Sequence, residues 1–292
     1  MNILITSAGS PAAVGLIKSI NLVQEKTHKN YNITAIDCDP LAAGLFLANN
    51  YHVVPPIKDI SNPWEFLKNI ILKHKINFIL PNSESELILF SKNKKNLEKM
   101  GVKIWISPLN TINLCNNKFK FWEKLHKDFN MPFYISSKIF SKPDQGAGSR
   151  GCKLIETPKN THLWEYLPGN EYTVDVFCDG NSNSLGTIVR KREGIKAGIS
   201  VKGSIIRNKY LEEESEKLCK TLNIVGPCNI QWKENESQQP KLIECNPRLG
   251  GGTYFSTLAG VNPAEIYLQN IKTKQYPKEI KVTRYFEEII TS

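Results

Sequence analysis

The first 106 residues alternate between short apolar runs and amphipathic stretches, and this pattern constrains the fold more than any other feature. The apolar runs predict strands, and apolar residues at helical spacing predict helices between them. The predicted strands lie at residues 2–6, 32–36, 51–55 and 77–80, and the helices at residues 14–23, 41–48 and 64–74. Such alternation is typical of a parallel sheet covered on both faces. We therefore predict a Rossmann-like α/β domain whose ligands bind beyond the carboxyl ends of its strands.

Two loops at such strand ends carry small or acidic residues. Residues 7–11 are small, and Asp37 and Asp39 follow the second predicted strand. An acidic residue at that place is one part of the dinucleotide-binding fingerprint, but the first loop lacks the Gly-x-Gly that the fingerprint also requires. We therefore do not expect NAD to bind here.

Composition narrows the class of protein. The chain has 292 residues, 40% hydrophobic and 23% charged, which suits two folded domains. No apolar run approaches the roughly 18 residues of a membrane span, and the start lacks the basic region of a secretory signal. The seven cysteines include no Cys-x-x-Cys pair, which argues against a zinc ribbon or a disulfide framework. We expect a cytoplasmic protein with reduced thiols.

The net charge of +10 could attract nucleic acid or anionic metabolites. The basic residues are spread out, with only short clusters at residues 92–95 and 190–192, and no RNA-recognition or helix-turn-helix motif is present. A general bias toward lysine accounts for the charge, so nucleic-acid binding is the less favoured interpretation.

The second half of the chain has a different character. Ser107 and Pro108 end the first unit, residues 111–129 predict a helical connector, and strands outnumber helices after residue 132, as in an α+β domain. Two later helices are predicted at residues 212–222 and 263–271. We divide the chain into four parts, which are residues 1–107, 108–130, 131–176 and 177–292.

A glycine-rich loop at residues 142–151 is the strongest local feature of this half. Its small residues let backbone amides approach an anion, and Lys142 and Arg150 add positive charge. The Gly-Lys-Ser/Thr ending of a Walker A loop is missing. Alone, such a loop is an ordinary flexible hairpin about as often as a phosphate site.

A second feature is a linker followed by a strand. The backbone of Glu165, Tyr166 and Leu167 could pair with an adenine edge, and Glu171, which opens a predicted strand over residues 171–177, could accept from ribose hydroxyls. By itself, this segment is better explained as a solvated hairpin with surface acids.

The third feature is a set of oxygen ligands. Residues 229–233 and 241–244 predict a hairpin in which Gln231 faces Glu244, and Asn246 projects on the same side as Glu244. Such oxygens suit Mg²⁺, which usually also binds substrate phosphates. Arg248 adds a cation for a transferring phosphoryl group. A simple capped turn explains this set of residues less well.

Taken in order, these motifs resemble the ATP-grasp superfamily, in particular the branch of the carbamoyl phosphate synthetase large chain. Residues 3–9 and 81–87 are similar to its pre-ATP-grasp domain, and Asn117-Lys118 is similar to the Asp-Lys that opens the helix before the ATP site. The resemblance covers most of the chain. It implies an α/β pre-ATP-grasp domain with a parallel sheet, a connecting helix, a small ATP-binding lid subdomain and a C-terminal α+β ATP-grasp subdomain with the metal site.

The resemblance also implies roles for individual residues. Arg248 and Lys142 would be catalytic, and Gln231, Glu244 and Asn246 would hold Mg²⁺, with Mn²⁺ as the alternative ion. The residues that would bind ATP are Lys118, Lys142, Gly146, Gly148, Ser149, Glu165, Tyr166, Leu167 and Glu171. For the substrates, Ser7 would meet a carboxylate at a helix N-terminus, and Glu86 would hold an amino group unless it is only a surface or capping acid. Arg190 and Arg192 are similar to the basic strand of the family near the substrate.

This sequence departs from the family pattern in two ways. Only about ten residues separate Pro132 from Lys142, and residues 151–165 lack the usual helix, so we expect a trimmed lid that excludes water less well. Asn117 and Gln231 replace acids, so the cation should bind more weakly.

The expected activity is an ATP-dependent carboxylate–amine ligation through an acyl phosphate. Positioning, Mg²⁺ and arginine would supply the catalysis. The expected partners are a small carboxylate and a small amine, with a homodimer as the usual assembly and no membrane association. The alternatives are phosphoryl transfer without ligation and a degenerate ATP-binding protein with a binding or regulatory role.

Overall fold

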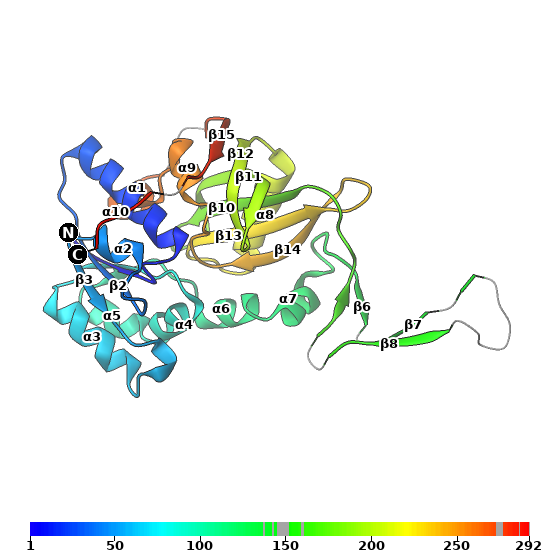
Figure 1. Cartoon of the computed structure of the whole chain (residues 1–292), viewed down its shortest axis with the longest axis horizontal. Helices are drawn as coiled ribbons and strands as arrows, with labels where there is room; N and C mark the ends of the chain where they lie inside the picture. Colours follow the sequence, from blue (N-terminus) through cyan, green and yellow to red (C-terminus); the bar gives the residue numbers. More distant parts are fainter. Residues whose placement is uncertain are drawn as a thin grey trace.

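The computed structural model of the chain describes residues 1–136, 138–141, 143–144, 152–158, 161–272, 277–285 and 287–291 (Figure 1). Its N-terminal domain is built on a five-stranded sheet of order β3-β2-β1-β4-β5, in which every pairing is parallel. The strands are β1 (Asn2–Thr6), β2 (Asn32–Asp37), β3 (Asn50–Val53), β4 (Phe78–Leu80) and β5 (Lys103–Ile104). This confirms the predicted parallel-sheet domain and adds β5, a two-residue strand that the sequence pattern does not reveal.

Five α-helices and one 3-10 helix connect these strands. They are α1 (Pro11–Thr27), α2 (Ala43–Phe46), η1 (Ile57–Asp59), α3 (Pro63–Lys73), α4 (Glu84–Lys92) and α5 (Lys94–Lys99). Local sequence explains where α1 begins, because the Ser10 hydroxyl accepts from the Ala13 amide and Pro11 fills the first turn. The start of α1 therefore lies at the carboxyl end of β1.

The connector between the two halves is two helices, so the single helix predicted at residues 111–129 is wrong. Helix α6 (Leu109–Cys115) is capped at its end by Asn116, and α7 (Lys118–Leu125) begins two residues after this cap. Asn117 separates them because its side chain accepts from the Lys120 amide and so caps a new helix. This break places Lys118 at an exposed helix start.

The second half contains a six-stranded antiparallel sheet of order β14-β13-β10-β11-β12-β15. Its strands are β10 (Glu171–Cys178), β11 (Ser184–Lys196), β12 (Ile199–Ile206), β13 (Gly226–Glu234), β14 (Pro240–Asn246) and β15 (Ile280–Thr283). The accompanying helices are α8 (Lys209–Thr221), α9 (Tyr254–Leu258) and α10 (Pro263–Gln269). The domain boundary proposed between residues 176 and 177 falls inside strand β10. The other proposed domain boundaries stay predictions.

Both faces of β10 are buried, which explains its continuous apolar character. Val174 and Val176 face a core that includes Leu218 of α8, whereas Phe177 joins a core shared with the N-terminal domain. That shared core brings Leu16 of α1 together with Phe255 of α9. The two halves therefore pack directly against each other, and the loops at their junction are held in fixed positions.

The small subdomain consists of two short strand pairs. β6 (Tyr134–Ser136) pairs with β9 (Leu163–Trp164), and β7 (Lys138–Ser141) pairs with β8 (Lys153–Glu156). Figure 1 shows β7 and β8 extending away from the rest of the chain. Over residues 152–158 and 161–165, the described part of this region, no helix is present. In these residues the subdomain therefore shows short strands and no helix, and its trimming relative to the family stays a prediction.

All seven cysteines are free thiols in the structure, and five of them are buried. Within the described residues, no helix is long and apolar enough to cross a bilayer.

Candidate active site

The predicted ligand hairpin is formed by β13 and β14. Gln231 lies directly opposite Glu244, and Asn229 lies opposite Asn246, so the register expected from the sequence is confirmed. The Asn246 side-chain amide donates to Glu244 Oε1 at 3.0 Å. This contact leaves Asn246 Oδ1 and Glu244 Oε2 as candidate ligand oxygens.

The start of α7 places Lys118 beside Glu244 of this hairpin. Its Nζ lies 3.6 Å from Glu244 Oε2, while its side chain remains 77% exposed. A solvated contact of this length contributes little to stability. The contact places the Lys118 cation beside the carboxylate of the predicted ligand set.

The ligand set fits Mg²⁺ in chemistry but is incomplete by itself. Gln231, Glu244 and Asn246 offer one carboxylate and two amide carbonyls, which are hard oxygen ligands. Among the described residues, no group of three or more His, Cys, Asp or Glu side chains is placed to hold a metal ion. The remaining ligands would have to come from phosphates and water, as is usual for Mg²⁺.

A buried polar cluster supports the loop that follows β14. Asp175 accepts from Arg190 Nε at 2.8 Å and Nη2 at 3.0 Å, and also from Asn229 Nδ2 at 3.0 Å and Ser256 Oγ at 2.7 Å. The Arg190 side chain is only 3% exposed. Arg190 was predicted to lie near the substrate, but its cation is neutralised by Asp175, so in this structure it supports the loop.

The glycines of this loop are required by that cluster. A Cβ on Gly252 would lie 2.1 Å from Arg190 Nη1, and a Cβ on Gly250 would lie 2.3 Å from Asn229 Nδ2. Only glycine lets the backbone pass so close to both side chains. The glycine run therefore fixes the path of the chain just after Arg248.

Arg284 reaches the same loop from the end of β15. Its guanidinium donates to the Gly251 carbonyl and lies 5.1 Å above the Phe255 ring. Burial and the neighbouring Arg190 both lower the pKa of Arg284. Sequence reasoning missed Arg284 and Asp175, although an aspartate inside an apolar strand was a signal for the latter.

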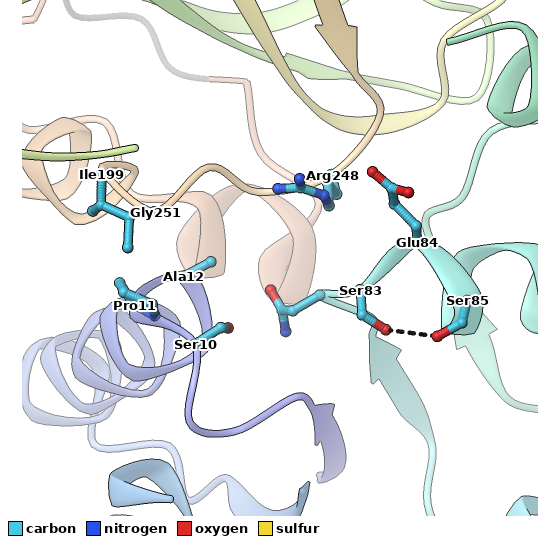
Figure 2. Close-up of a pocket in the computed structure, with 10 residues that line it drawn as sticks. Ser10, Pro11, Ala12, Ser83, Glu84, Ser85, Ile199, Arg248 and Gly251 are labelled. Atoms are coloured by element: carbon cyan, nitrogen blue, oxygen red, sulfur yellow. Dashed lines mark hydrogen bonds between the residues drawn. The ribbon is translucent and has the colours of Figure 1, made fainter. Parts of the chain in front are cut away.

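A cleft of about 610 Å³ lies between the two halves of the molecule (Figure 2). Its walls come from the starts of α1 and α4, from Ile199, and from the loop after β14. The lining residues are Ser10, Pro11, Ala12, Asn82, Ser83, Glu84, Ser85, Ile199, Arg248 and Gly251. No acid among the described residues forms an ion pair with Arg248, so its charge is available to a ligand in the cleft.

Glu86 does not line this cleft. It is 6% exposed and accepts from the hydroxyls of Thr6 and Ser7 and from the Ser83 amide at 3.1 Å. It therefore acts as a buried capping acid that ties α4 to β1. Ser7, whose hydroxyl lies 3.2 Å from Glu86, belongs to the same internal network.

Glu171 and Arg192 form an ion pair with each other. Arg192 also donates to Ser200 Oγ at 3.1 Å and to the Gly198 carbonyl at 2.6 Å. Both predicted roles, ribose binding by Glu171 and substrate contact by Arg192, would require this pair to rearrange or to offer its remaining oxygen or N–H groups.

The predicted adenine linker has no regular secondary structure after residue 164. The Glu165 carboxylate binds the Phe133 amide at 3.0 Å and Lys241 Nζ at 3.0 Å, which fixes the linker to the start of the small subdomain. Tyr166 is 81% exposed, whereas Leu167 is buried.

A second cavity, of about 560 Å³, lies at the start of α7. It is lined by residues 116–120 and His162. Phe119 stacks on His162 with ring centroids 4.8 Å apart, and Trp122 and Tyr134 extend this aromatic cluster. The cluster joins α7 to the small subdomain beside Lys118.

The predicted phosphate-binding loop lies outside the described residues. This applies to Lys142, Gly146, Gly148 and Ser149.

The fold is that of an ATP-grasp protein, and two family models match different parts of the chain. Residues 158–289 match the family described as ATP-grasp in the biosynthetic pathway with Ter operon. Residues 3–105 match the PylC-like N-terminal domain.

Solved structures show the same fold at low sequence identity. An L-amino acid ligase from Bacillus licheniformis is 15% identical with a TM-score of 0.61, covering 92% of this chain and 73% of that chain. The N5-carboxyaminoimidazole ribonucleotide synthetase of Thermotoga maritima is 17% identical with a TM-score of 0.59, covering 92% and 76%. The biotin carboxylase domain of Hydrogenobacter thermophilus 2-oxoglutarate carboxylase, a dimer with MgADP and bicarbonate, is 13% identical with a TM-score of 0.60, covering 94% and 71%.

Proposed function

We propose that this protein is an ATP- and magnesium-dependent carboxylate–amine ligase. A substrate carboxylate oxygen attacks the γ-phosphorus of ATP, the bond to the β-phosphate oxygen breaks, and ADP leaves. An amine then attacks the acyl carbon of the acyl phosphate, phosphate leaves, and the nitrogen loses a proton to give an amide.

The observation that carries this proposal is the meeting of Lys118, Glu244 and Asn246, with Gln231 opposite Glu244. These residues come from the connector and from both strands of the hairpin, so the fold itself assembles them. Bound magnesium would neutralise charge on the phosphate oxygens. Lys118 adds a cation on the nucleotide side, and Arg248 adds one on the cleft side.

We also assign the nucleotide contacts, as the resemblance implies them. Lys142, Gly146, Gly148 and Ser149 would close over the phosphates. The backbone of Glu165, Tyr166 and Leu167 would hold adenine, and Glu171 would hold ribose.

The comparisons support this chemistry at the level of the fold. Two similar structures are named as an amino acid ligase and a carboxyaminoimidazole ribonucleotide synthetase, and a third contains MgADP. We extend ATP and Mg²⁺, with Mn²⁺ as the alternative ion, and small-molecule substrates to this chain. Since that third structure is a dimer, we also propose a homodimer.

The decisive experiment is an ADP-release screen over pairs of carboxylates and amines, with hydroxylamine trapping. An acyl phosphate gives a hydroxamate, so carboxylate-dependent hydroxamate supports ligation. ADP formation without hydroxamate would support phosphoryl transfer to another group instead.

Glu244→Ala should abolish ADP formation and leave the fold intact, because it removes the only carboxylate of the ligand set. ADP release and far-ultraviolet circular dichroism test this. Glu236→Ala, in the exposed loop of the same hairpin, is the matched control and should be active. Wild-type turnover in Glu244→Ala would remove the metal assignment.

The second candidate function is nucleotide binding without ligation, which the reduction of the small subdomain to short strand pairs favours. Calorimetric binding of MgATP, with no ADP formed over the whole substrate panel, would establish it.

A further inference from the structure

One wall of the cleft contains a buried hydrogen-bond acceptor without a donor. Asn82 follows Pro81 at the carboxyl end of β4, lines the cleft and is 6% exposed. Its Oδ1 has no hydrogen-bond partner in the structure. Buried polar atoms are normally paired, so an orphaned oxygen at a cleft wall points to a ligand that donates.

The orientation of this side chain is determined by its surroundings. Asn82 Nδ2 donates to the carbonyls of Thr6 at 3.2 Å and Leu80 at 3.0 Å. A carbonyl can only accept, so the amide nitrogen must face these two groups and the oxygen must face away from them. The Asn82 backbone amide also donates to Thr6 Oγ1 at 3.2 Å, which holds the residue rigidly.

The next residues add further acceptors to the same wall. Glu84 and Ser85 are exposed, and Figure 2 shows the Glu84 side chain extending toward the Arg248 side of the cleft, while the Ser83 hydroxyl turns to Ser85. Among the described residues, no base forms an ion pair with Glu84. Among the described residues that line the cleft, Arg248 is the one cation and Glu84 is the one carboxylate.

We propose that Asn82 Oδ1 and the Glu84 carboxylate bind the primary amine of the acceptor substrate. The inference rests on the proposed ligase function and moves the amine-binding role from Glu86, which is fully engaged internally, to its neighbours. An ammonium group carries three N–H donors and a positive charge, so its chemistry suits both an amide oxygen and a carboxylate. Arg248 would then face the acyl phosphate that the amine attacks.

Glu86 has an indirect part in this subsite. By accepting from Thr6 and from the Ser83 amide, it fixes the segment that carries Asn82 and Glu84. It is thus a positioning residue that does not touch the amine.

The first test measures binding without turnover. Methylammonium should cause saturable shifts in the amide resonances of residues 82–85 in the ¹⁵N-labelled protein, whereas tetramethylammonium, which has the same charge but no N–H donor, should not. Glu84→Gln should weaken methylammonium binding about tenfold, as expected for a charge-assisted hydrogen bond. Glu213→Gln, an exposed acid on α8, is the matched control and should bind as the wild type does.

Equal binding of the two cations, or unchanged affinity in Glu84→Gln, would overturn the proposal. Asn82→Ala should weaken binding as well. Because Asn82→Ala loses two side-chain hydrogen bonds, its folding is checked first by thermal melting. If Asn82→Ala does not fold, the Glu84→Gln result decides.

The second test uses turnover with a substrate pair from the ADP-release screen. Glu84→Gln should raise the KM for the amine about tenfold and change the KM for the carboxylate much less. An unchanged amine KM contradicts the subsite. A wild-type enzyme that forms no hydroxamate contradicts the ligase function instead, and the methylammonium titration still tests the subsite.

Discussion

Glu234 shows how one buried carboxylate holds a turn beside the site. It accepts from the Tyr172 hydroxyl at 2.7 Å, and from the Asn170 amide at 3.1 Å and side chain at 2.8 Å. A Cβ on Gly169 would lie 2.5 Å from Glu234 Cβ, so glycine is required there. Burial alone would raise the pKa of Glu234, but the donors from Tyr172 and Asn170 outweigh burial and lower it. Burial first, and then Glu234, raise the pKa of Tyr172 to about 12.

Glu234→Gln should therefore destabilise the protein in a pH-dependent way. The lowered pKa means that the carboxylate stabilises the fold above about pH 4.3, the ordinary pKa of glutamate, and that this contribution is lost as the pH falls through the folded-state pKa. We expect a loss of about 1–3 kcal/mol at pH 7 that shrinks toward about pH 3. Urea unfolding at both pH values measures this. An equal loss at the two values, or the same loss in the exposed control Glu236→Gln, would contradict the assignment.

At the scale of elements, the loop after β14 depends on close backbone approach. Gly250 and Gly252 touch the side chains that bind Asp175, so the loop and the large sheet form one rigid unit. The loop carries Arg248, and the hairpin before it carries Glu244. Rigid support of this kind keeps catalytic groups in productive geometry.

Gly252→Ala should displace the loop, because the new Cβ would overlap Arg190 Nη1. We expect a stability loss of about 1–3 kcal/mol and a fall in ADP formation larger than the loss of folded protein explains. Thermal melting and ADP release measure the two effects. Gly180→Ala, where a Cβ meets nothing within 4 Å, is the control and should behave as the wild type does. Normal activity in Gly252→Ala would show that Arg248 does not need this support.

At the scale of the whole molecule, a shared core joins the N-terminal domain to the large sheet. Leu16, Phe177 and Phe255 belong to one buried cluster, although they come from β-sheet and helical parts of both halves. The cleft lies at this junction. Ligands that bind only the folded molecule should therefore stabilise the protein as a unit.

MgATP should raise the melting temperature of the wild type, with a stabilisation of about 2.7 kcal/mol at a ligand concentration 100 times Kd. Lys142→Ala should weaken this effect, since the glycine-rich loop is expected to bind phosphates. Lys153→Ala, an exposed lysine on β8, serves as the control. A full MgATP shift in Lys142→Ala would count against the phosphate-loop prediction.

The sequence by itself determined the features that depend on neighbours along the chain. Alternating strands and helices predicted the parallel sheet, and the short polar loop between two strands predicted the pairing of Gln231 with Glu244. The motif order predicted the ATP-grasp fold. The sheet and the hairpin follow from periodicity and turn chemistry, which act within a few residues, whereas the ATP-grasp fold is what the resemblance of the motifs implied.

Only the tertiary structure decided which polar side chains are free to meet a ligand. Arg190 and Glu86 looked like substrate residues, but contacts with distant segments engage Arg190 with Asp175 and Glu86 with Thr6. In the sequence, Asn82 was one residue of the motif at residues 81–87. The structure shows that the Thr6 and Leu80 carbonyls hold its amide nitrogen, which leaves its side-chain oxygen without a donor. The physical reason is that a buried polar group must be satisfied by whatever packing brings beside it, and packing joins residues that are far apart in the chain.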